Sequence, residues 1–329
     1  MFRYLLIIVL ALSHSPAFGQ VSAPIFCDNE NHPDFYEVEV DGARREYLLH
    51  IPEGLPPETG FALIINFHGF GDCASNYAES VGELSGLNGL ADERGFVVAY
   101  PQAMVRAKGD PYWEPGDSGG DIEVNDLLFT RHLVADVNTR TLINPTHVFA
   151  AGYSNGGMMA YDLACRASDL FPAVAIMSGV MLADSCDETG ATSIIHFHGL
   201  ADTVIPIDGS GNFPSVFANI AFWLDHNGIS NDSLVSTVLD AGAVSRDLYT
   251  GGRENTSVAL YVVNREFGKA GGHVWFSEAI DGLTPNQIMW RFLSASSVET
   301  PPSSTRLPLG LQWFLLRAGR IVEDGSEQQ

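Results

Sequence analysis

A glycine-rich pentapeptide around Ser154 constrains this chain more than any other feature. Gly152-Tyr153-Ser154-Asn155-Gly156 directly follows the apolar run His147–Ala151 and precedes Gly157–Tyr161, which can begin a helix. A strand, a tight Gly-x-Ser-x-Gly turn and a helix together form a nucleophile elbow, which lifts a serine above the edge of an α/β sheet. The glycines are needed because a Cβ beside the strained serine would collide with the neighbouring strand or helix. The sequence therefore predicts that Ser154 is a catalytic nucleophile.

A serine at such an elbow needs a carboxylate and a histidine, which in α/β-hydrolases follow it in that order. The segment Thr192–Phe197 is predicted to be a buried strand, and Asp202 lies in the loop after it. Loops at the carboxyl ends of parallel strands carry functional side chains in such sheets. We therefore predict that Asp202 is the acid; the alternative is a solvated aspartate that caps a turn.

His273 best fits the role of the base. It follows the strand-like segment Ser257–Val263, and Gly271-Gly272 would let the loop bring the ring over the serine. His196 and His198 alternate on one face of the preceding strand, a spacing that metal ligands also use. Because no third ligand lies at a plausible spacing, we expect satisfied core or strand-end histidines and no metal site.

Two backbone amides are expected to stabilise the oxyanion. One belongs to Asn155, the residue after the nucleophile, and the other should come from a loop after an early strand. Ala62–Phe67 is a continuous apolar strand that runs into His68-Gly69-Phe70-Gly71. We assign the second donor to the amide of Phe70, and we expect His68 to brace this loop.

Aromatic residues near these segments are candidates for substrate binding. The Gly/Pro/Asp-rich loop Ala103–Gly120 carries Tyr112 and Trp113. Trp113 either presents a flat face to a sugar or an aromatic acid, or it fills the side of the domain, and both alternatives stay open. Tyr153, inside the pentapeptide, is the second candidate.

A second serine motif points to a different class of enzyme. Gly116-Asp117-Ser118-Gly119-Gly120 matches the nucleophile segment of chymotrypsin-like proteases, which run His, Asp, Ser along the chain. No histidine ahead of Ser118 lies in an Ala-Ala-His-Cys setting, and the surrounding segments alternate between helix and strand. The motif is therefore not interpreted as a protease site.

The chain resembles the secreted esterase family that groups poly(3-hydroxybutyrate) depolymerase-like proteins with feruloyl esterases. The resemblance runs from about Tyr36 to about Phe292 in the family's order, and its most specific part is the string Ser-Asn-Gly-Gly-Met-Met. It implies an α/β-hydrolase fold and a triad of Ser154, Asp202 and His273. The matching segments are Asn66–Gly71, Gly152–Tyr161, His198–Pro206 and Gly272–Trp275.

Two departures from the family concern the substrate pocket. Tyr112-Trp113-Glu114-Pro115-Gly116 stands where the family often has Trp-Asn-(Ala/Thr)-Gly, so only the tryptophan matches. Phe70 stands where the family often has a small residue or cysteine. Both differences bear on specificity and not on the type of reaction.

The first 19 residues are typical of a secretory signal peptide. Arg3 precedes the apolar run Leu5–Leu12, and Ala17-Phe18-Gly19 forms a cleavage site before Gln20. The run is too short to span a bilayer. We therefore expect an exported protein, extracellular or periplasmic.

Cysteine content and charge fit that expectation. An even number of cysteines in an exported protein favours disulfides, and we favour Cys165–Cys186 and Cys27–Cys73 among the three possible connectivities. The formal net charge of −23 would repel nucleic acid and anionic lipid, so we expect neither as a partner. No cofactor is expected, and the oligomeric state is left open.

The remaining pattern predicts one α/β domain over residues 20–294, followed by a Ser/Pro-rich linker and a short apolar tail of unknown role over residues 295–329. Strands alternate with helices, which indicates a mostly parallel sheet covered on both faces. Asp41-Gly42 between two alternating segments predicts an amino-terminal hairpin. Helices are expected over Glu79–Glu93, Val124–Thr139, Phe213–Asn227 and Pro285–Phe292.

These features together predict a secreted serine carboxylic-ester hydrolase. Its leading substrates are ferulate-like esters of plant cell-wall polysaccharide, and the alternatives are hydroxybutyrate polyesters and acetylxylan. A non-catalytic carbohydrate-binding protein on a hydrolase scaffold is the alternative from another class.

Overall fold

The computed structural model describes residues 27–105, 109–116, 125–186, 190–264 and 271–296. Three predicted features lie outside these residues: the signal peptide, the motif around Ser118, and the linker and tail from residue 297 onwards. Among the described helices, none combines the length and the apolar character that crossing a membrane requires.

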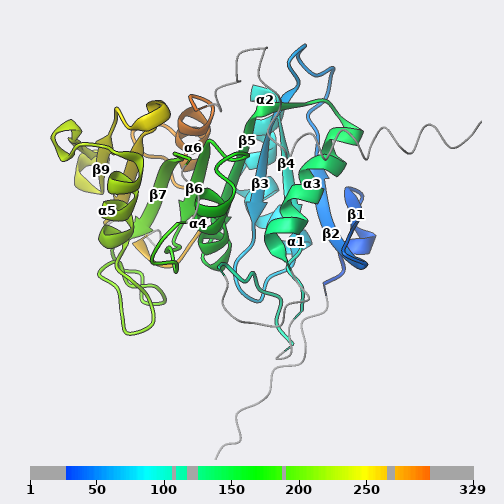
Figure 1. Ribbon diagram of the computed structural model, residues 1–329, viewed down its shortest axis with the longest axis horizontal. Coiled ribbons are helices and arrows are strands. Elements are labelled where there is room, and N and C mark those ends of the chain that lie inside the picture. The colour runs from blue at the N-terminus through cyan, green and yellow to red at the C-terminus, as the bar shows by residue number, and fades with distance from the viewer. Residues whose placement is uncertain (1–26, 106–108, 117–124, 187–189, 265–270, 297–329) are drawn as a thin grey trace, which may run out of the picture.

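The described residues form a ten-stranded sheet in the order β1-β2-β4-β3-β5-β6-β7-β10-β9-β8 (Figure 1). Its central strands, from β4 to β10 in this order, run parallel, and an antiparallel hairpin extends each edge. The strands are β1 (Phe35–Val40), β2 (Ala43–His50), β3 (Phe61–Phe67), β4 (Phe96–Pro101), β5 (Ile143–Tyr153), β6 (Ala173–Met177), β7 (Ser193–Gly199), β8 (Val235–Leu239), β9 (Val244–Tyr249) and β10 (Val258–Val263).

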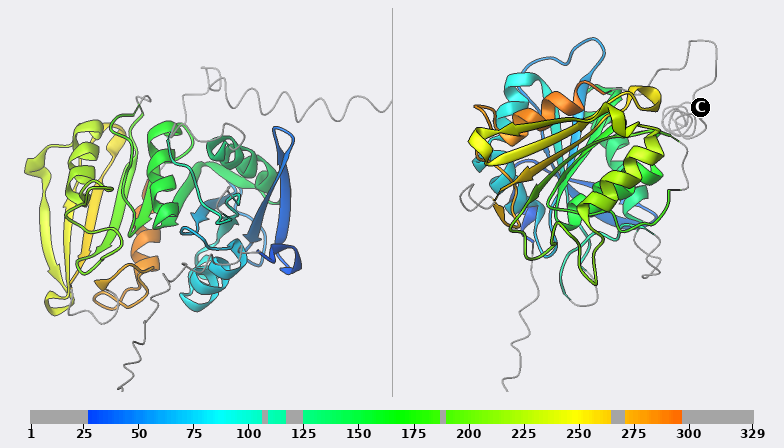
Figure 2. Two further views of the ribbon diagram at one scale, coloured as in Figure 1. Left: turned by 90° about the horizontal axis from the view of Figure 1, so that it is seen from below. Right: turned by 90° about the vertical axis from the view of Figure 1, so that its left-hand side faces the viewer.

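Helices cover both faces of the sheet (Figure 2). Phe129, Leu163 and Trp223, from α3, α4 and α5, belong to one buried apolar cluster. Leu90 and Met289, from α2 and α6, belong to a second cluster on the opposite face. The helices are α1 (Ala74–Tyr77), α2 (Leu87–Arg94), α3 (Asp126–Arg140), α4 (Asn155–Arg166), α5 (Val216–Asn227) and α6 (Pro285–Leu293).

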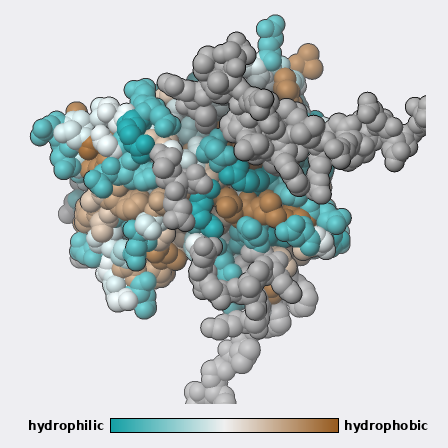
Figure 3. All heavy atoms as spheres, viewed as in Figure 1, coloured by the Kyte–Doolittle hydropathy of each residue, from teal (hydrophilic) through white to brown (hydrophobic). Residues whose placement is uncertain are grey.

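Parallel strands covered on both faces must be apolar throughout, and this explains the continuous apolar runs in the sequence. Every residue of β6 is buried, and all but one residue of β3 are buried. On the face shown in Figure 3, apolar residues gather in patches to the left and right of the centre, with hydrophilic residues between and around them.

Local chemistry explains the predicted hairpin and one error. Asp41 and Gly42 both have positive φ (49° and 81°), as a two-residue type I′ turn requires, and they join β1 to β2. The helix predicted over Glu79–Glu93 is instead divided into a π-helical segment, Ala78–Leu84, and α2. Gly86 separates the two in a left-handed conformation (φ 76°), which interrupts the helix.

Candidate active site

The predicted elbow is present between β5 and α4. Ser154 adopts φ 54° and ψ −118°, a strained conformation for a residue with a side chain, and its amide donates to the carbonyl of Met177 (2.9 Å). A Cβ on Gly152 would lie 2.2 Å from the carbonyl oxygen of Gly156. A Cβ on Gly156 would lie 2.1 Å from that of Phe67. The glycines therefore allow α4 to pack directly against the ends of β5 and β3.

The structure brings Ser154, His273 and Asp202 into one line of hydrogen bonds. His273 Nε2 lies 2.8 Å from Ser154 Oγ, and His273 Nδ1 lies 2.7 Å from Asp202 Oδ2. The other carboxylate oxygen of Asp202 accepts from the amides of Val204 and Ile205, both at 2.9 Å. This geometry lets an imidazole receive a proton from the serine while a carboxylate stabilises the resulting cation.

The environment of Asp202 keeps its carboxylate ionised. Burial by itself would raise the pKa of Asp202. The hydrogen bonds from His273 and the Ile205 amide, together with the nearby His273 and His198, outweigh burial and lower this pKa below its ordinary value. The acid is therefore available as an anion over the whole neutral range.

The loop that carries His273 is held by backbone contacts. Gly199, the last residue of β7, approaches it so closely that a Cβ there would lie 2.3 Å from the carbonyl oxygen of Gly271. The Tyr153 hydroxyl donates to the carbonyl of His273 (2.8 Å), and Ser178 Oγ donates to the carbonyl of Val274 (3.1 Å). Tyr153, which the sequence suggested for substrate binding, thus has a contact that orients the histidine loop. Burial and the charges of Asp202 and Asp72 raise the pKa of Tyr153 to about 12, so its hydroxyl stays a donor.

The two predicted oxyanion donors lie on adjoining backbone segments. A Cβ on Gly69 would lie 3.6 Å from the Cβ of Ser154, so the loop after β3 passes beside the nucleophile. Phe70 follows in this loop, and Asn155 is the first residue of α4, where no helical carbonyl can accept its amide proton.

Both favoured disulfides are present in the structure: Cys27–Cys73, at the end of the oxyanion loop, and Cys165–Cys186.

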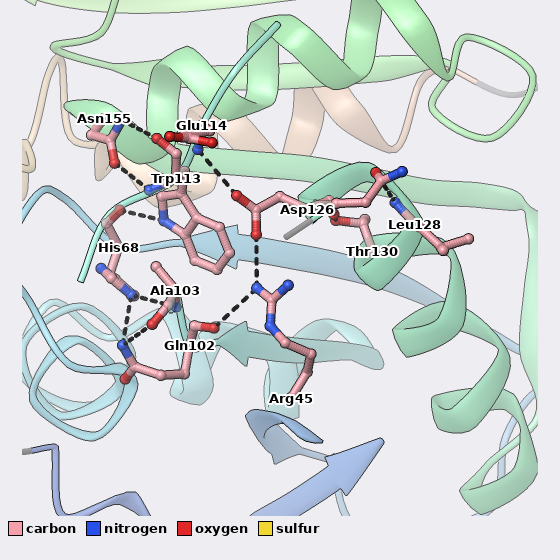
Figure 4. Close-up of polar contacts among 11 residues, drawn as sticks. Arg45, His68, Gln102, Ala103, Trp113, Glu114, Asp126, Leu128, Thr130 and Asn155 are labelled. Carbon is pink, nitrogen blue, oxygen red and sulfur yellow. Dashed lines mark hydrogen bonds and ion pairs between the residues drawn. The ribbon is translucent and has the colours of Figure 1, made fainter. Parts of the chain in front are cut away.

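His68 braces the oxyanion loop, as expected (Figure 4). Its Nδ1–H donates to the Gly69 carbonyl (2.7 Å), and its Nε2 accepts from the amide of Ala103 (3.1 Å). Burial lowers the pKa of His68 to about 4, so the ring is neutral at ordinary pH.

The structure contradicts the predicted role of Trp113 in substrate binding. Its side chain is only 1% exposed, so it does not offer a face to a sugar or an aromatic acid and instead fills the side of the domain. The indole Nε1–H donates to the carbonyl of His68 (2.9 Å), and the ring meets Phe67 edge to face. The side chain of Asn155 accepts from the Trp113 amide (2.8 Å) and donates to its carbonyl (3.0 Å). Trp113 therefore links the segment of His68 to that of Asn155 (Figure 4).

A buried ion pair that contacts the loop carrying Trp113 was not foreseen from the sequence. Arg45 of β2 and Asp126 of α3 lie 2.7 Å apart with almost no solvent exposure, and the second oxygen of Asp126 accepts from the Glu114 amide (3.0 Å; Figure 4). No local pattern links the two charges, because 81 residues separate them in the sequence.

A stacked aromatic pair with one exposed ring was also missed. Phe70 is 59% exposed, and its ring stacks on that of Tyr112, with centroids 5.5 Å apart and an interplanar angle of 24°. The only available signal was the aromatic residue at position 70, where the resembled family often has a small one. The flat aromatic surface considered for Trp113 is therefore formed by its neighbour Tyr112 together with Phe70 of the oxyanion loop.

The histidines of β7 are satisfied by each other and by neighbours. His196 and His198 are fully buried, and their rings are joined by a hydrogen bond of 3.0 Å.

Among the described residues, the acidic group Glu30, Glu37 and Glu46 is compact enough to hold a metal ion. Arg44 forms ion pairs with all three carboxylates and already supplies the positive charge.

Comparisons with solved structures identify the fold. An acetyl xylan esterase from Aspergillus awamori superposes over 79% of this chain and 98% of its own length with a TM-score of 0.54 and 14% identity. The structure titled sOPH native superposes over 87% of this chain and 95% of its own with a TM-score of 0.53 and 16% identity. These likenesses, with the sheet order above, show the predicted α/β-hydrolase fold.

Sequence comparisons find similar proteins that align with 50–77% of this chain. NocK of Nocardia uniformis subsp. tsuyamanensis, an inferred esterase, is 35% identical over 184 residues, which are 54% of this chain and 51% of NocK. Feruloyl esterase C of Emericella nidulans is 24% identical over 77% of this chain and 84% of its own length.

A protein of Aspergillus terreus named as a probable feruloyl esterase C is 29% identical over 50% of this chain and 57% of its own. The chain thus spans only about half the length of NocK and of this protein. The family model described as Esterase PHB depolymerase matches residues 45–244, which include the predicted nucleophile and acid. The resemblance expected from the motifs is therefore confirmed, and the chain belongs to the PHB depolymerase esterase family.

Proposed function

We propose that this protein is a serine carboxylic-ester hydrolase in which Ser154 is the nucleophile, His273 the base and Asp202 the acid. One observation carries the proposal: the uninterrupted hydrogen bonds from Ser154 Oγ through the His273 ring to Asp202 Oδ2, at 2.8 and 2.7 Å. Membership of an esterase family supports the same reaction class. A protein that only bound carbohydrate would need neither this line nor a strained serine.

The reaction follows from these contacts. Ser154 Oγ attacks the ester carbonyl as its proton moves to His273 Nε2, and Asp202 stabilises the imidazolium that forms. The amides of Phe70 and Asn155 donate to the developing oxyanion. His273 then protonates the departing alcohol, and a water activated by the same nitrogen releases the acid from the acyl-enzyme. Each oxyanion donor is worth roughly 10²–10³ in turnover in enzymes of this kind.

An aromatic acid is the substrate that the loop after β3 favours. Phe70 is the residue whose amide is the proposed oxyanion donor, and its exposed ring stacks on the half-buried ring of Tyr112. A ferulate-like acyl group on the carbonyl would thus come within reach of a flat aromatic face. Two of the relatives reported above are named as feruloyl esterases. We therefore favour ferulate esters of plant cell-wall polysaccharide.

A polyester of hydroxybutyrate is the second candidate. Besides Phe70, exposed apolar residues stand in the loops after β6 and β7, at the carboxyl edge of the sheet: Leu182, Leu200 and Val204. An apolar rim of this kind suits an aliphatic polyester as well as an aromatic acid.

Initial rates on methyl ferulate, acetylated xylan and a hydroxybutyrate oligomer test the proposal. Wild type should hydrolyse methyl ferulate fastest, and Ser154→Ala should lose roughly 10⁶-fold in kcat, the scale of removing a triad serine. A polyester preference would overturn the feruloyl assignment alone. Turnover that survives in Ser154→Ala, or saturable carbohydrate binding without any turnover, would overturn the esterase mechanism.

Export of the protein belongs to the same proposal. The two disulfides support it, because such bonds persist in oxidising compartments. Mass spectrometry of the mature protein secreted by its host tests it, and the expected amino terminus is Gln20.

A further inference from the structure

A chain of buried hydrogen bonds ends at the loop that carries Asp202. The Tyr161 hydroxyl lies 2.7 Å from His196 Nδ1, His196 Nε2 lies 3.0 Å from His198 Nδ1, and His198 Nε2 lies 2.8 Å from the carbonyl oxygen of Ile205. The proposed mechanism uses none of these three side chains. Tyr161 belongs to α4, whereas His196 and His198 belong to β7, so the chain links the elbow helix to the acid loop.

The acceptors at the Ile205 end fix the direction of every hydrogen bond in this series. The carbonyl of Ile205 can only accept, and so can the Asp202 carboxylate, whose Oδ2 lies 3.5 Å from the same His198 nitrogen. His198 must therefore carry its proton on Nε2, which leaves its Nδ1 to accept from His196. His196 in turn carries its proton on Nε2 and accepts at Nδ1, so the Tyr161 hydroxyl is the terminal donor.

The three hydrogen-bonded side chains are also electrically neutral. Tyr161, His196 and His198 are fully buried. Burial raises the pKa of Tyr161 and lowers the pKa of both histidines, and His198 lowers that of His196 further. Near neutral pH the three groups therefore act only as oriented dipoles.

Both backbone groups of Ile205 are held at this point. Its amide donates to Asp202 Oδ1 (2.9 Å), and its carbonyl accepts from His198 (2.8 Å). Asp202 Oδ2, the oxygen that receives the His273 hydrogen bond, faces the same His198 N–H at 3.5 Å. An apolar residue at position 198 would leave the Ile205 carbonyl without this donor, and a cation there would compete with His273 for the carboxylate.

We infer that Tyr161, His196 and His198 are positioning residues for the triad, which hold the turn Asp202–Ile205 and place a neutral N–H beside the Asp202 carboxylate. This inference rests on the proposed catalytic role of Asp202. Because the three groups act through Asp202, their loss should lower kcat and leave KM nearly unchanged.

The first experiment removes the terminal donor. Tyr161→Phe deletes one buried oxygen, and Tyr100→Phe is its matched control because that buried hydroxyl donates to Asn88 Oδ1 (2.6 Å), away from the triad. In each variant the hydrogen bond that the buried hydroxyl donates is lost. Tyr161→Phe should lower kcat about fivefold on the best ester with KM within about twofold, whereas Tyr100→Phe should keep kcat within about twofold.

The second experiment alters the histidine next to the acid. His198→Leu removes the donor to Ile205 and should lower kcat about 10²-fold, the scale of a misplaced catalytic group. His198→Gln has an amide N–H that can reach the same carbonyl and should recover about tenfold of this loss. Equal kcat for the Gln and Leu variants, or for Tyr161→Phe and Tyr100→Phe, would overturn the inference.

The inference and the proposed function fail separately. An active wild type whose variants show no such differences would overturn the inference and leave the esterase mechanism intact. Long-range ¹H–¹⁵N spectra read the imidazole tautomers without any turnover. Nε2–H tautomers for both His196 and His198 are expected, and an Nδ1–H tautomer at either ring would overturn the inference even if no ester is hydrolysed.

Discussion

On one side of Ser154 lies the oxyanion loop, and on the other lie the loops of Asp202 and His273. The first is braced by the Cys27–Cys73 disulfide and the indole of Trp113, and the loop that carries Trp113 is held in turn by the Arg45–Asp126 ion pair. The groups that we infer to brace the second are neutral: two imidazoles and a phenol.

The difference follows from what each side must position. The oxyanion side positions neutral backbone amides, so an ion pair whose two charges offset each other can support it. The acid side positions a carboxylate, and a second buried ion there would alter the interaction between Asp202 and His273. Oriented neutral donors hold this side without adding a charge.

The largest expected effect breaks the charged side. Arg45→Met leaves Asp126 buried without its cation, and loss of one partner of a buried pair typically costs about 3–5 kcal/mol of stability. Urea denaturation measures this cost. The double variant Arg45→Met, Asp126→Leu should recover part of it, because no uncompensated charge remains; a single variant as stable as wild type would contradict the assigned role.

The next effect is the contribution of His68, on the oxyanion side, to the pH dependence of stability. Burial lowers the pKa of His68 from 6.5 to about 4, whereas in the unfolded chain the ring titrates near its ordinary value. Between these values the unfolded state binds more protons, so stability falls as the pH is lowered through this window. The part due to His68 is up to about 3 kcal/mol.

Denaturation of wild type and His68→Gln at pH 6.5 and 4.5 isolates that part. The variant should lose less stability on acidification than wild type, although His196 and His198 still contribute in the same direction. An identical pH dependence of the two proteins would show that His68 is not a source of the acid sensitivity.

A smaller effect tests the indole that joins the oxyanion segments. Trp113→Phe keeps most of the buried ring but removes the N–H that donates to the His68 carbonyl. We expect a loss of about 1 kcal/mol in stability and a decrease in kcat at nearly constant KM. If Trp113 contacted the substrate instead, KM would rise with little change in stability.

The smallest effect concerns the exposed end of the same side. Phe70→Leu removes the stack with Tyr112 and should reduce the preference for methyl ferulate over methyl butyrate about fivefold, from an aromatic contact worth about 1 kcal/mol. Tyr112→Phe retains the two rings and should retain most of the preference. An unchanged preference in Phe70→Leu would remove this pair from the acyl pocket.

Features set by neighbouring residues could be predicted from the sequence. The elbow depends on glycines two residues before and after Ser154, the hairpin depends on Asp41-Gly42, and the order of Asp202 and His273 follows from where apolar strands end. The roles of Ser154, Asp202 and His273 stay predictions until variants are assayed.

Features set by distant residues could not be predicted. The burial of Trp113 depends on contacts with Phe67 and His68, and the Arg45–Asp126 pair depends on how β2 approaches α3. The outer hairpin β8–β9 was also missed, because it lies at the sheet edge and its strands lack a continuous apolar run. Side-chain partners across the fold carry no local signal.

The strained backbone at Ser154 has a consequence for engineering. With φ 54° and ψ −118°, this position favours a glycine, so Ser154→Gly should relax the elbow while abolishing the proposed nucleophile. A selection that rewards only heat resistance would therefore enrich inactive clones at this codon. Directed evolution of this scaffold has to score turnover in every round, because relief of the strain at this position removes the proposed nucleophile.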